Sequence, residues 1–234
     1  STSTVPTAVK ASRPLLASLD PANNIPRRVP LPILRPPLTI CKSTSVTLER
    51  GQRVVIMPDR GGVADALTQL LKTRSVEVLR IEGEPDADAL ADTLKSWTTA
   101  GPVHGVYWLP ALDNEGNLRD MDLTTWHEAV RVRIKSLYIT MRALFEHIGK
   151  PGTFLVSATR LGGQHGYDEA GAVAPLGGAV VGFTKTYTRE RLDVHTKALD
   201  FEAASKPQEV ADLLIEETLC DPGAVEIGYK KGLR

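Results

Sequence analysis

The sequence predicts an α/β protein with a doubly wound, mostly parallel sheet, preceded by an extended proline-rich arm. From residue 51 onward, short apolar segments alternate with longer segments whose apolar residues recur every three or four positions. Strands that alternate with helices in this way form a parallel sheet covered by helices on both faces. Residues 1–50, by contrast, are rich in proline, which fixes φ and removes a hydrogen-bond donor.

The second part of the chain is predicted to hold six strands and five helices. The strands are the short apolar runs 53–57, 76–81, 103–109, 152–157, 194–199 and 224–229. One helix opens at Gly61 and Gly62, and the others are 86–97, 126–145, 176–189 and 208–219. The longest carries an apolar stripe of Trp126, Val130, Ile134, Tyr138, Met141 and Phe145. Right-handed crossovers between parallel strands make such a domain Rossmann-like.

We therefore divide the chain into 1–50, a linker and proline-rich packing arm, and 51–234, a Rossmann-like domain. Residues 29–38 (VPLPILRPPL) cannot form a helix, because each proline ring fixes φ and removes a hydrogen-bond donor. An extended or polyproline conformation is expected, and its Val, Leu and Ile side chains indicate that it lies against a surface. A proline-rich ligand for another domain is the alternative.

The composition excludes several classes of protein. Lys and Arg number 28, as do Asp and Glu, whereas a nucleic-acid binder or a polybasic membrane anchor would need a basic surplus. No apolar run approaches the ~18 residues that span a bilayer, and no signal peptide opens the chain. Two cysteines, Cys41 and Cys220, and five histidines without paired spacing supply no metal site. We expect a cytoplasmic protein, and because the sequence begins with Ser1, a piece of a longer polypeptide.

The turn after the first strand is unsuited to a dinucleotide. A dinucleotide needs glycines there, so that its pyrophosphate can approach the N-terminus of the next helix. Residues 57–63 read MPDRGGV, with only the adjacent Gly61 and Gly62, and Asp59 puts an anion beside the expected phosphate. We therefore predict a plain strand-to-helix turn capped by Asp59. The loop 162–166 after the fourth strand is interpreted as a flexible turn, or else as the lining of a vestigial pocket.

Residues 154–157 (FLVS) and 178–190 (GAVVGFTKTYTRE) together resemble the short-chain dehydrogenase/reductase family. In that family a strand ends in a catalytic serine, and a Tyr-x-x-x-Lys pair follows. The lysine lowers the pKa of the tyrosine, so that its phenol can donate a proton to the substrate carbonyl. The resemblance puts Ser157 at the serine position, Val173 at the tyrosine position and Gly177 at the lysine position.

These residues predict that the chain has no catalytic machinery. Valine and glycine cannot act as the acid and its partner, and Arg133 stands near the position of the family's asparagine. Ser157 is interpreted as a strand-end hydroxyl. Tyr167 and Lys185 are eighteen positions apart (185 − 167), so they do not form the motif and are expected at the surface. We predict no catalytic, cofactor-binding or metal-binding residues in this chain.

Four segments extend the resemblance to one branch of the family. They are 105–113, 182–190, 197–201 and 224–229. They look like the non-catalytic, structural subdomain of ketoreductase domains in type I polyketide synthases and polyunsaturated fatty acid synthases. The resemblance implies a degenerate reductase fold that stabilises a catalytic ketoreductase subdomain in the same polypeptide, and that subdomain would bind NADPH.

Two other functions remain open. The first is a divergent reductase that keeps NAD(P) through Arg60, Gly61, Gly62 and Glu82, with Glu82 accepting from a ribose hydroxyl. The second is a docking site for an acyl carrier protein, whose acidic helix would need a basic patch; Arg131, Arg133 and Lys135 are the candidates. For the structural subdomain, we expect the helices 126–145 and 176–189 to form the surface that meets the catalytic half. The glycines 177, 178 and 182 would allow close approach there.

Overall fold

The computed structural model describes residue 24 and residues 30–168, 172 and 174–234. The chain separates into two units, Ser1–Leu31 and Pro32–Arg234. The linker predicted at the beginning of the chain lies outside the described residues, as does Val173.

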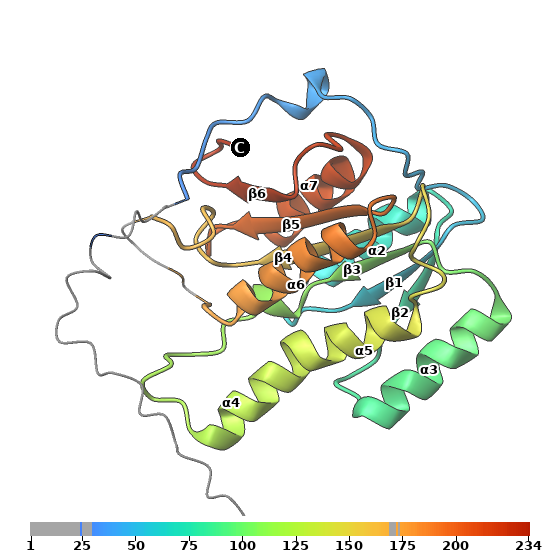
Figure 1. Ribbon diagram of the computed structural model, residues 1–234, viewed down its shortest axis with the longest axis horizontal. Coiled ribbons are helices and arrows are strands. Elements are labelled where there is room, and N and C mark those ends of the chain that lie inside the picture. The colour runs from blue at the N-terminus through green and yellow to red at the C-terminus, as the bar shows by residue number, and fades with distance from the viewer. Residues whose placement is uncertain (1–23, 25–29, 169–171, 173) are drawn as a thin grey trace, which may run out of the picture. The chain divides into compact units, whose positions relative to one another are not determined.

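The second unit is built on a parallel sheet of six strands, as the sequence predicts (Figure 1). The strands are β1 (Arg53–Met57), β2 (Glu77–Arg80), β3 (Gly105–Trp108), β4 (Phe154–Thr159), β5 (His195–Phe201) and β6 (Glu226–Tyr229). Their order is β2-β1-β3-β4-β5-β6, so the chain reverses its direction of winding between β1 and β3. Such a switch point is where doubly wound sheets bind ligands, at the carboxyl ends of the strands.

Helices cover both faces of this sheet (Figure 1). One face packs against α2 (Val63–Thr73) and α7 (Pro207–Leu219). The other packs against α3 (Ala87–Ala100), α6 (Gly177–Glu190) and a long helix made of α4 (Leu123–Val130), η3 (Arg131–Lys135) and α5 (Ser136–Ala143). None of the described helices is long and apolar enough to cross a membrane.

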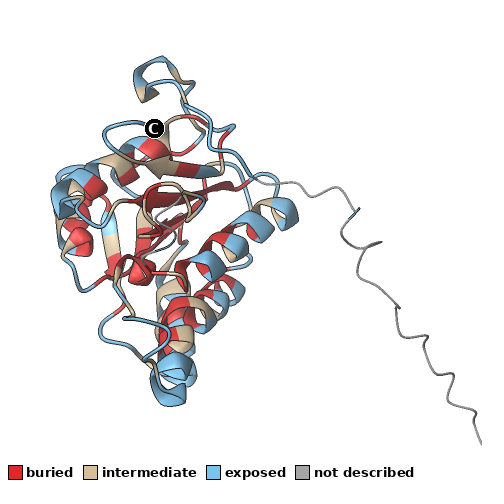
Figure 2. Ribbon diagram, turned by 90° about the vertical axis from the view of Figure 1, so that its left-hand side faces the viewer, coloured by how far each residue is buried: buried red, intermediate tan, exposed pale blue. Residues whose placement is uncertain are grey.

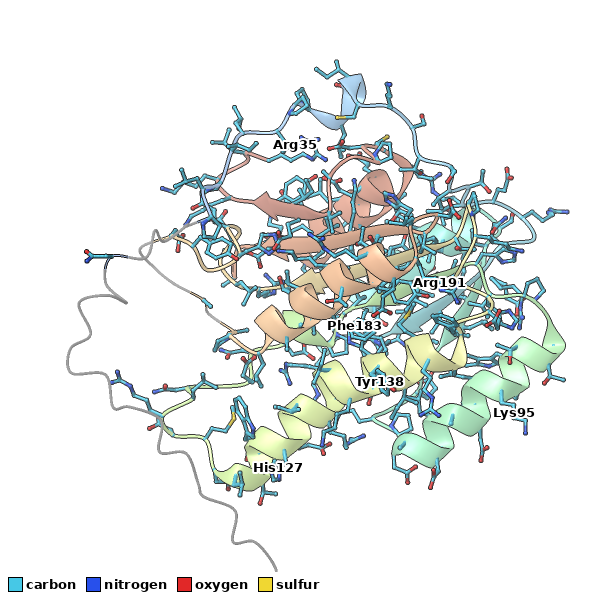
Figure 3. All side chains as sticks on the ribbon, viewed as in Figure 1. Arg35, Lys95, His127, Tyr138, Phe183 and Arg191 are labelled. Carbon is cyan, nitrogen blue, oxygen red and sulfur yellow. The ribbon has the colours of Figure 1, made fainter. Side chains whose placement is uncertain are left out.

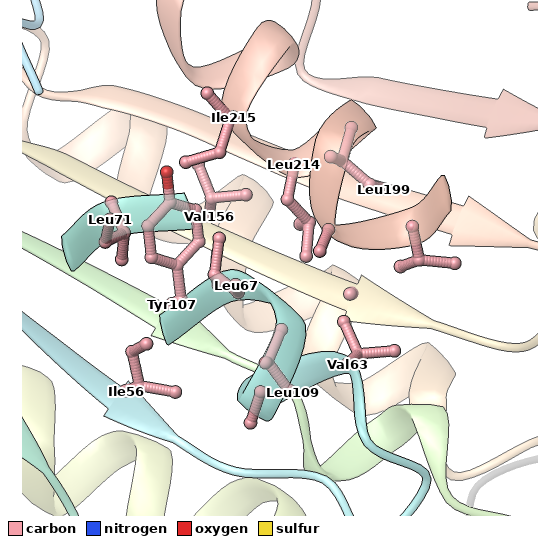
Figure 4. Close-up of a cluster of buried hydrophobic side chains, with 14 of the residues drawn as sticks. Ile56, Val63, Leu67, Leu71, Tyr107, Leu109, Val156, Leu199, Leu214 and Ile215 are labelled. Carbon is pink, nitrogen blue, oxygen red and sulfur yellow. The ribbon is translucent and has the colours of Figure 1, made fainter. Parts of the chain in front are cut away.

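Alternating strand residues supply the two apolar cores. In β1, Val54 and Ile56 join the core under α2 and α7, which Figure 4 shows in part, and Val55 and Met57 join the core on the other face. All four are at most 1% exposed. A strand buried on both faces has no polar side, so these strands read as continuous apolar runs. Figure 2 shows the same pattern, with buried residues on the strands and exposed residues on the outer faces of the helices.

The long helix differs from the prediction at its centre, where η3 is a π-helix. The backbone N–H of Ser136 bonds to the carbonyl of Arg131, five residues earlier, and the Ser136 hydroxyl donates to the same oxygen at 3.0 Å. The indole Nε1 of Trp108, on β3, donates to the carbonyl of Arg133 at 2.8 Å. A buried indole therefore takes one carbonyl of the helix, which accounts for the local π-bulge.

The arm ahead of the sheet makes polar contacts more than apolar ones. Ile33, Leu34 and Ile40 are 73–75% exposed, so the expected apolar contact with a surface is not made by these side chains. Backbone pairing instead joins Ser43 to Cys220 in an antiparallel bridge. Among the described residues of the arm, Val46 and Leu48, near its end, are the ones that enter the core. Apart from the short helical turn Leu38–Ile40, the described part of the proline-rich run has no helix, as proline predicts.

Candidate functional site

The turn between β1 and α2 is occupied by a carboxylate of the chain itself. Asp59, which is 7% exposed, accepts hydrogen bonds from the backbone N–H groups of Val63 at 3.1 Å and Ala64 at 2.7 Å. These are the first two residues of α2. Unpaired N–H groups at the N-terminus of a helix attract anions such as phosphate. Here Asp59 takes two of those donors, so the predicted cap is present.

The two glycines of this turn make room for that carboxylate. A Cβ on Gly61 would lie 3.0 Å from Oδ2 of Asp59. Gly62 has a φ of +93°, a left-handed conformation that side chains other than glycine rarely adopt. The glycines that resemble part of a phosphate loop therefore shape the turn around Asp59.

A second carboxylate lies over the same turn. Asp113, which follows β3, accepts from the backbone N–H of Arg60 with both oxygens, at 2.9 and 3.1 Å. Burial raises the pKa of Asp113 and the charge of Asp59 acts in the same direction, while the hydrogen bond from Arg60 opposes them. The guanidinium of Arg60 pairs with Glu84 at 2.5 Å. Arg60 therefore contacts two carboxylates, Asp113 through its backbone and Glu84 through its side chain. Glu82, the other residue considered for nucleotide binding, is exposed after the end of β2.

Arg133 projects from the π-bulge into the protein and is 7% exposed. Its Nη2 donates to the carbonyl of Asp113 at 2.9 Å and lies 3.6 Å from Oε2 of Glu115, whose side chain is 1% exposed. The other oxygen of Glu115 accepts the backbone N–H of Leu176 at 2.8 Å, at the start of α6. A buried ion pair thus joins the loop after β3, the π-bulge and α6.

Ser157 is buried and already paired. Its Oγ lies 2.8 Å from Oγ1 of Thr184, on α6, and both residues are 0% exposed. Ser157 is buried because it lies within β4 and not at its end. It pairs with Trp108 of β3, and the strand continues for two more residues, to Thr159. Gly177, which the sequence resemblance puts at the lysine position, faces the end of β4, and a Cβ there would lie 3.2 Å from the Cβ of Thr159.

The loop after β4 is tied to β5 and β6. The buried Asp200 accepts from the backbone N–H groups of Leu161 at 2.6 Å and His165 at 2.8 Å. Gly163 lies directly against the sheet, since a Cβ on it would stand 2.3 Å from the carbonyl oxygen of Tyr229. The sequence predicted a flexible turn at 162–166, and in the structure these contacts tie the loop backbone to β5 and β6.

The other residues singled out from the sequence do not assemble into a site. Tyr167 is 52% exposed, and Lys185 pairs with Glu226 at 2.7 Å with a side chain 46% exposed, as expected for surface residues. Within the proposed basic patch, Arg131 pairs with Glu128 and Arg133 is buried, which leaves Lys135 as the exposed member. In the described part of the chain, no group of three or more His, Cys, Asp or Glu could hold a metal ion.

Sequence reasoning missed three acidic residues that organise this edge of the sheet. Asp113 and Glu115 follow β3, and Asp200 lies near the end of β5. The signal was available, since acidic residues just after predicted strands fall at the edge where ligands bind. Their partners are backbone N–H groups of distant segments, and no residue pattern marks those.

A groove lies between α5 and α6 on the outer face of the protein. Its volume is about 320 Å³, and it is lined by Tyr138, Met141, Arg142, Phe145, Phe183, Thr186, Tyr187 and Glu190. Tyr138 is 54% exposed and Phe145 41% exposed. Figure 3 shows Tyr138 and Phe183 on the two neighbouring helices. A Cβ built on Gly178 or Gly182 meets no atom of another described segment within 4 Å, so the space beside them is open in the described part of the chain.

No protein-family model matches the sequence, and no curated protein does. Solved structures do match. A short-chain dehydrogenase/reductase from Brucella melitensis, described as glucose/ribitol dehydrogenase, superposes with a TM-score of 0.63 at 12% identity, over 78% of this chain and 97% of that one. A short-chain dehydrogenase/reductase from Serratia marcescens gives the same TM-score and coverages at 14% identity.

A third structure, a short chain dehydrogenase from Burkholderia cenocepacia in complex with NADP, has a TM-score of 0.60 at 15% identity, over 78% of this chain and 98% of that one. At sequence identities this low, the similarity shows a shared fold and does not show a shared activity. The chain therefore has the fold of the short-chain dehydrogenases/reductases over about four-fifths of its length.

Proposed function

We propose that this chain is a non-catalytic member of the short-chain dehydrogenase/reductase superfamily. Its role is to stabilise the NADPH-dependent β-ketoacyl reductase half of a multidomain polyketide or fatty acid synthase in the cytoplasm. The observation that carries the proposal is the placement of Asp59. A dinucleotide would have to displace this carboxylate from the N–H groups of Val63 and Ala64, and would bring its own negative charge beside Asp113.

The region next to this turn supports the same conclusion. Arg133 and Glu115 fill the space between the π-bulge and the start of α6 with a buried ion pair. Ser157 bonds to Thr184 and offers no hydroxyl to a substrate. A reductase needs a proton donor aimed at a carbonyl, and Gly177, at the position of the lysine that would assist it, has no side chain.

The surface that would meet the catalytic half is the face of α5 and α6. It combines partly exposed aromatic side chains with two glycines that leave room for close approach. Apolar grooves rimmed by charged residues, here Arg142 and Glu190, mark sites of protein association. In this proposal the NADPH belongs to the catalytic half, and none is held by this chain.

Calorimetric titration of the chain with NADPH, and separately with NADH, tests the absence of a cofactor site. We expect no saturable heat with either nucleotide at concentrations up to about 1 mM, which corresponds to less than about 4 kcal/mol of binding free energy. A micromolar dissociation constant would support the alternative, a divergent reductase that binds through Arg60, Gly61, Gly62 and Glu82. Repeating the titration with Arg60→Ala would then show whether that turn is the site.

The partner surface is tested in a polypeptide that carries both halves. Gly178→Leu should lower the urea midpoint and the ketoreductase activity of the two-half protein, because overpacking costs roughly 1–3 kcal/mol where another surface packs. In this chain alone the leucine should cost little, since the site is open. Lys95→Leu, which adds an exposed leucine on α3 (Figure 3), is the matched control. Equal effects of Gly178→Leu in both proteins would mean that the partner surface lies elsewhere.

A further inference from the structure

Two arginines from opposite ends of the second unit bind one aspartate. Asp221 accepts from Nη2 of Arg35 with both oxygens, at 2.8 and 2.7 Å, and from Nη2 of Arg234 at 2.7 Å. Arg35 belongs to the arm, and Arg234 follows the last strand. Charge-assisted hydrogen bonds of this kind are stronger than neutral ones, and the planar guanidinium fixes their geometry.

A tight turn brings Arg234 to this position. After β6, Lys231 and Gly232 both have positive φ angles, 51° and 73°. The backbone N–H of Lys230 donates to the carbonyl of Leu233 at 3.0 Å, and the N–H of Leu233 donates back at 2.9 Å. Two consecutive left-handed residues closed by such a pair form the two-residue turn that reverses a strand. The chain therefore doubles back, and the side chain of Arg234 is 7% exposed.

The same guanidinium reaches a second carboxylate that is fully buried. Nε and Nη2 of Arg234 donate to the two oxygens of Glu217 at 2.5 and 3.0 Å. Glu217 also forms an ion pair with Lys197, and both side chains are 0% exposed. Without Arg234, two separate pairs would remain, Lys197 with Glu217 and Arg35 with Asp221. Among the ion pairs, Arg234 is the residue that connects the buried pair to the arm.

The backbone of the arm is held by the same end of the chain. The N–H of Arg35 donates to the carbonyl of Arg234 at 2.8 Å, and Nη1 of Arg234 donates to the carbonyl of Pro36 at 3.0 Å. Further along, the N–H of Thr44 donates to the carbonyl of Leu219, and the N–H of Asp221 donates to the carbonyl of Lys42, both at 2.8 Å.

Burial contributes little to the seating of residues 35–44, which we call the strap. Of the two large apolar side chains in the strap, Leu38 is half-buried and Ile40 is 74% exposed, and none of residues 35–44 is fully buried. The preceding Leu34 is 73% exposed. Apolar anchoring begins at Val46 and Leu48, which are buried in the core beneath α2 and α7. The strap therefore depends mainly on polar contacts and has a fixed base at residue 46. Such a segment can open locally while the rest of the fold persists. Figure 1 shows it passing beside α7 and β6 near the C-terminus.

We propose that Arg234 is a latch that closes the strap over the ends of α7 and β6. When Arg234 bridges Glu217 and Asp221, the arm is held through Arg35 and Pro36. When the bridge is lost, residues 35–44 detach as one unit that hinges near Val46, and the sheet remains folded. This inference is independent of the proposed function, because it concerns only contacts inside this chain.

Hydrogen exchange of the whole chain, followed by mass spectrometry, tests the latch. Arg234→Gln should raise exchange at the amides of Arg35, Thr44 and Asp221 at least tenfold, while the amides of β1 keep the wild-type rate. The backbone carbonyl that accepts from Arg35 is still present in this variant, so the change would report detachment of the strap. Lys231→Gln, an exposed neighbour in the same turn, is the control and should leave all three amides protected.

Two results would overturn the latch. One is unchanged protection of the strap in Arg234→Gln. The other is an equal rise in exchange at the strap and in β1, because Arg234 would then act on global stability alone. Arg234→Lys tests whether the positive charge alone is enough. A single ammonium should not contact both Glu217 and Asp221 as the guanidinium does, so we expect the strap to open in this variant also. Full protection with lysine would refute the bridging role.

Discussion

The carboxylate of Asp59 accepts the backbone N–H of Ala64 at 2.7 Å, inside the first turn of α2. Two N–H groups at the N-terminus of this helix, those of Val63 and Ala64, are therefore satisfied within the chain. The same contact that caps the helix thus removes the donors that an anionic ligand would use.

Replacing Asp59 should lower the stability of the protein. Asp59→Ala leaves the N–H groups of Val63 and Ala64 without their partner, and loss of such a cap costs about 0.5–2 kcal/mol. Urea unfolding measured by circular dichroism would detect the change. Asp65→Ala is the matched control, because that aspartate is exposed and pairs only at the surface, with Arg80. An equal loss in both variants would argue against the cap.

The Ser157 hydroxyl should matter for packing and not for reduction. Ser157→Ala should cost about 0.5–1.5 kcal/mol of unfolding free energy, because a buried hydrogen bond to Thr184 is lost. In a polypeptide that also carries the catalytic half, we expect ketone reduction to stay close to the wild-type rate. Combining Ser157→Ala with Thr184→Val should recover part of the loss, since both partners are then apolar. A hundredfold fall in turnover by the folded Ser157→Ala protein would contradict the interpretation.

Two glycines of α6 should respond in opposite ways to alanine. Gly182→Ala should stabilise this chain by up to about 1 kcal/mol, because the site is open and alanine is the better helix former. Gly177→Ala should destabilise it, since the new Cβ would stand 3.2 Å from Thr159 and 3.3 Å from Leu161. Thermal melts of the two variants make the comparison. A gain in stability for both would mean that β4 can yield to the added methyl group.

Stability should rise with pH between about 4 and 6.5 because of His195. Burial lowers the pKa of this histidine from 6.5 to about 4, and the charge of Lys197 acts in the same direction, against a contact with the backbone oxygen of Glu217. In this range the unfolded chain binds a proton that the folded chain does not, so acidification favours unfolding, by roughly 3 kcal/mol in full.

His195→Gln should remove this dependence, because glutamine does not titrate. Unfolding free energies measured in urea at intervals from pH 4 to pH 7 would give the slopes of the two proteins. His127→Gln, at an exposed site on α4, is the control and should keep the wild-type slope. A variant at His195 that retains the full slope would show that another group controls stability in this range.

The sequence determined the layout of the sheet and its helices. In 53–57 every residue after Arg53 is apolar because the strand is buried on both faces, and all six predicted strands form. The turn at Asp59, and Val173 and Gly177 at the positions where the resemblance puts the tyrosine and the lysine, were also readable from the sequence as departures from a reductase site. These features are local, so each depends on residues that are neighbours in the chain.

Tertiary structure decided the features that depend on partners far apart in sequence. The π-bulge arises because Trp108, on β3, donates a hydrogen bond to the carbonyl of Arg133 in the helix. The spacing of apolar residues in the helix does not predict that contact. The loop at Gly163 is held by Asp200 and by the backbone of β6. Arg133 is charged and reads as a surface residue, yet it is buried because Glu115 compensates it. Burial of a charge depends on a partner within a few ångströms, and only folding brings such a partner into place.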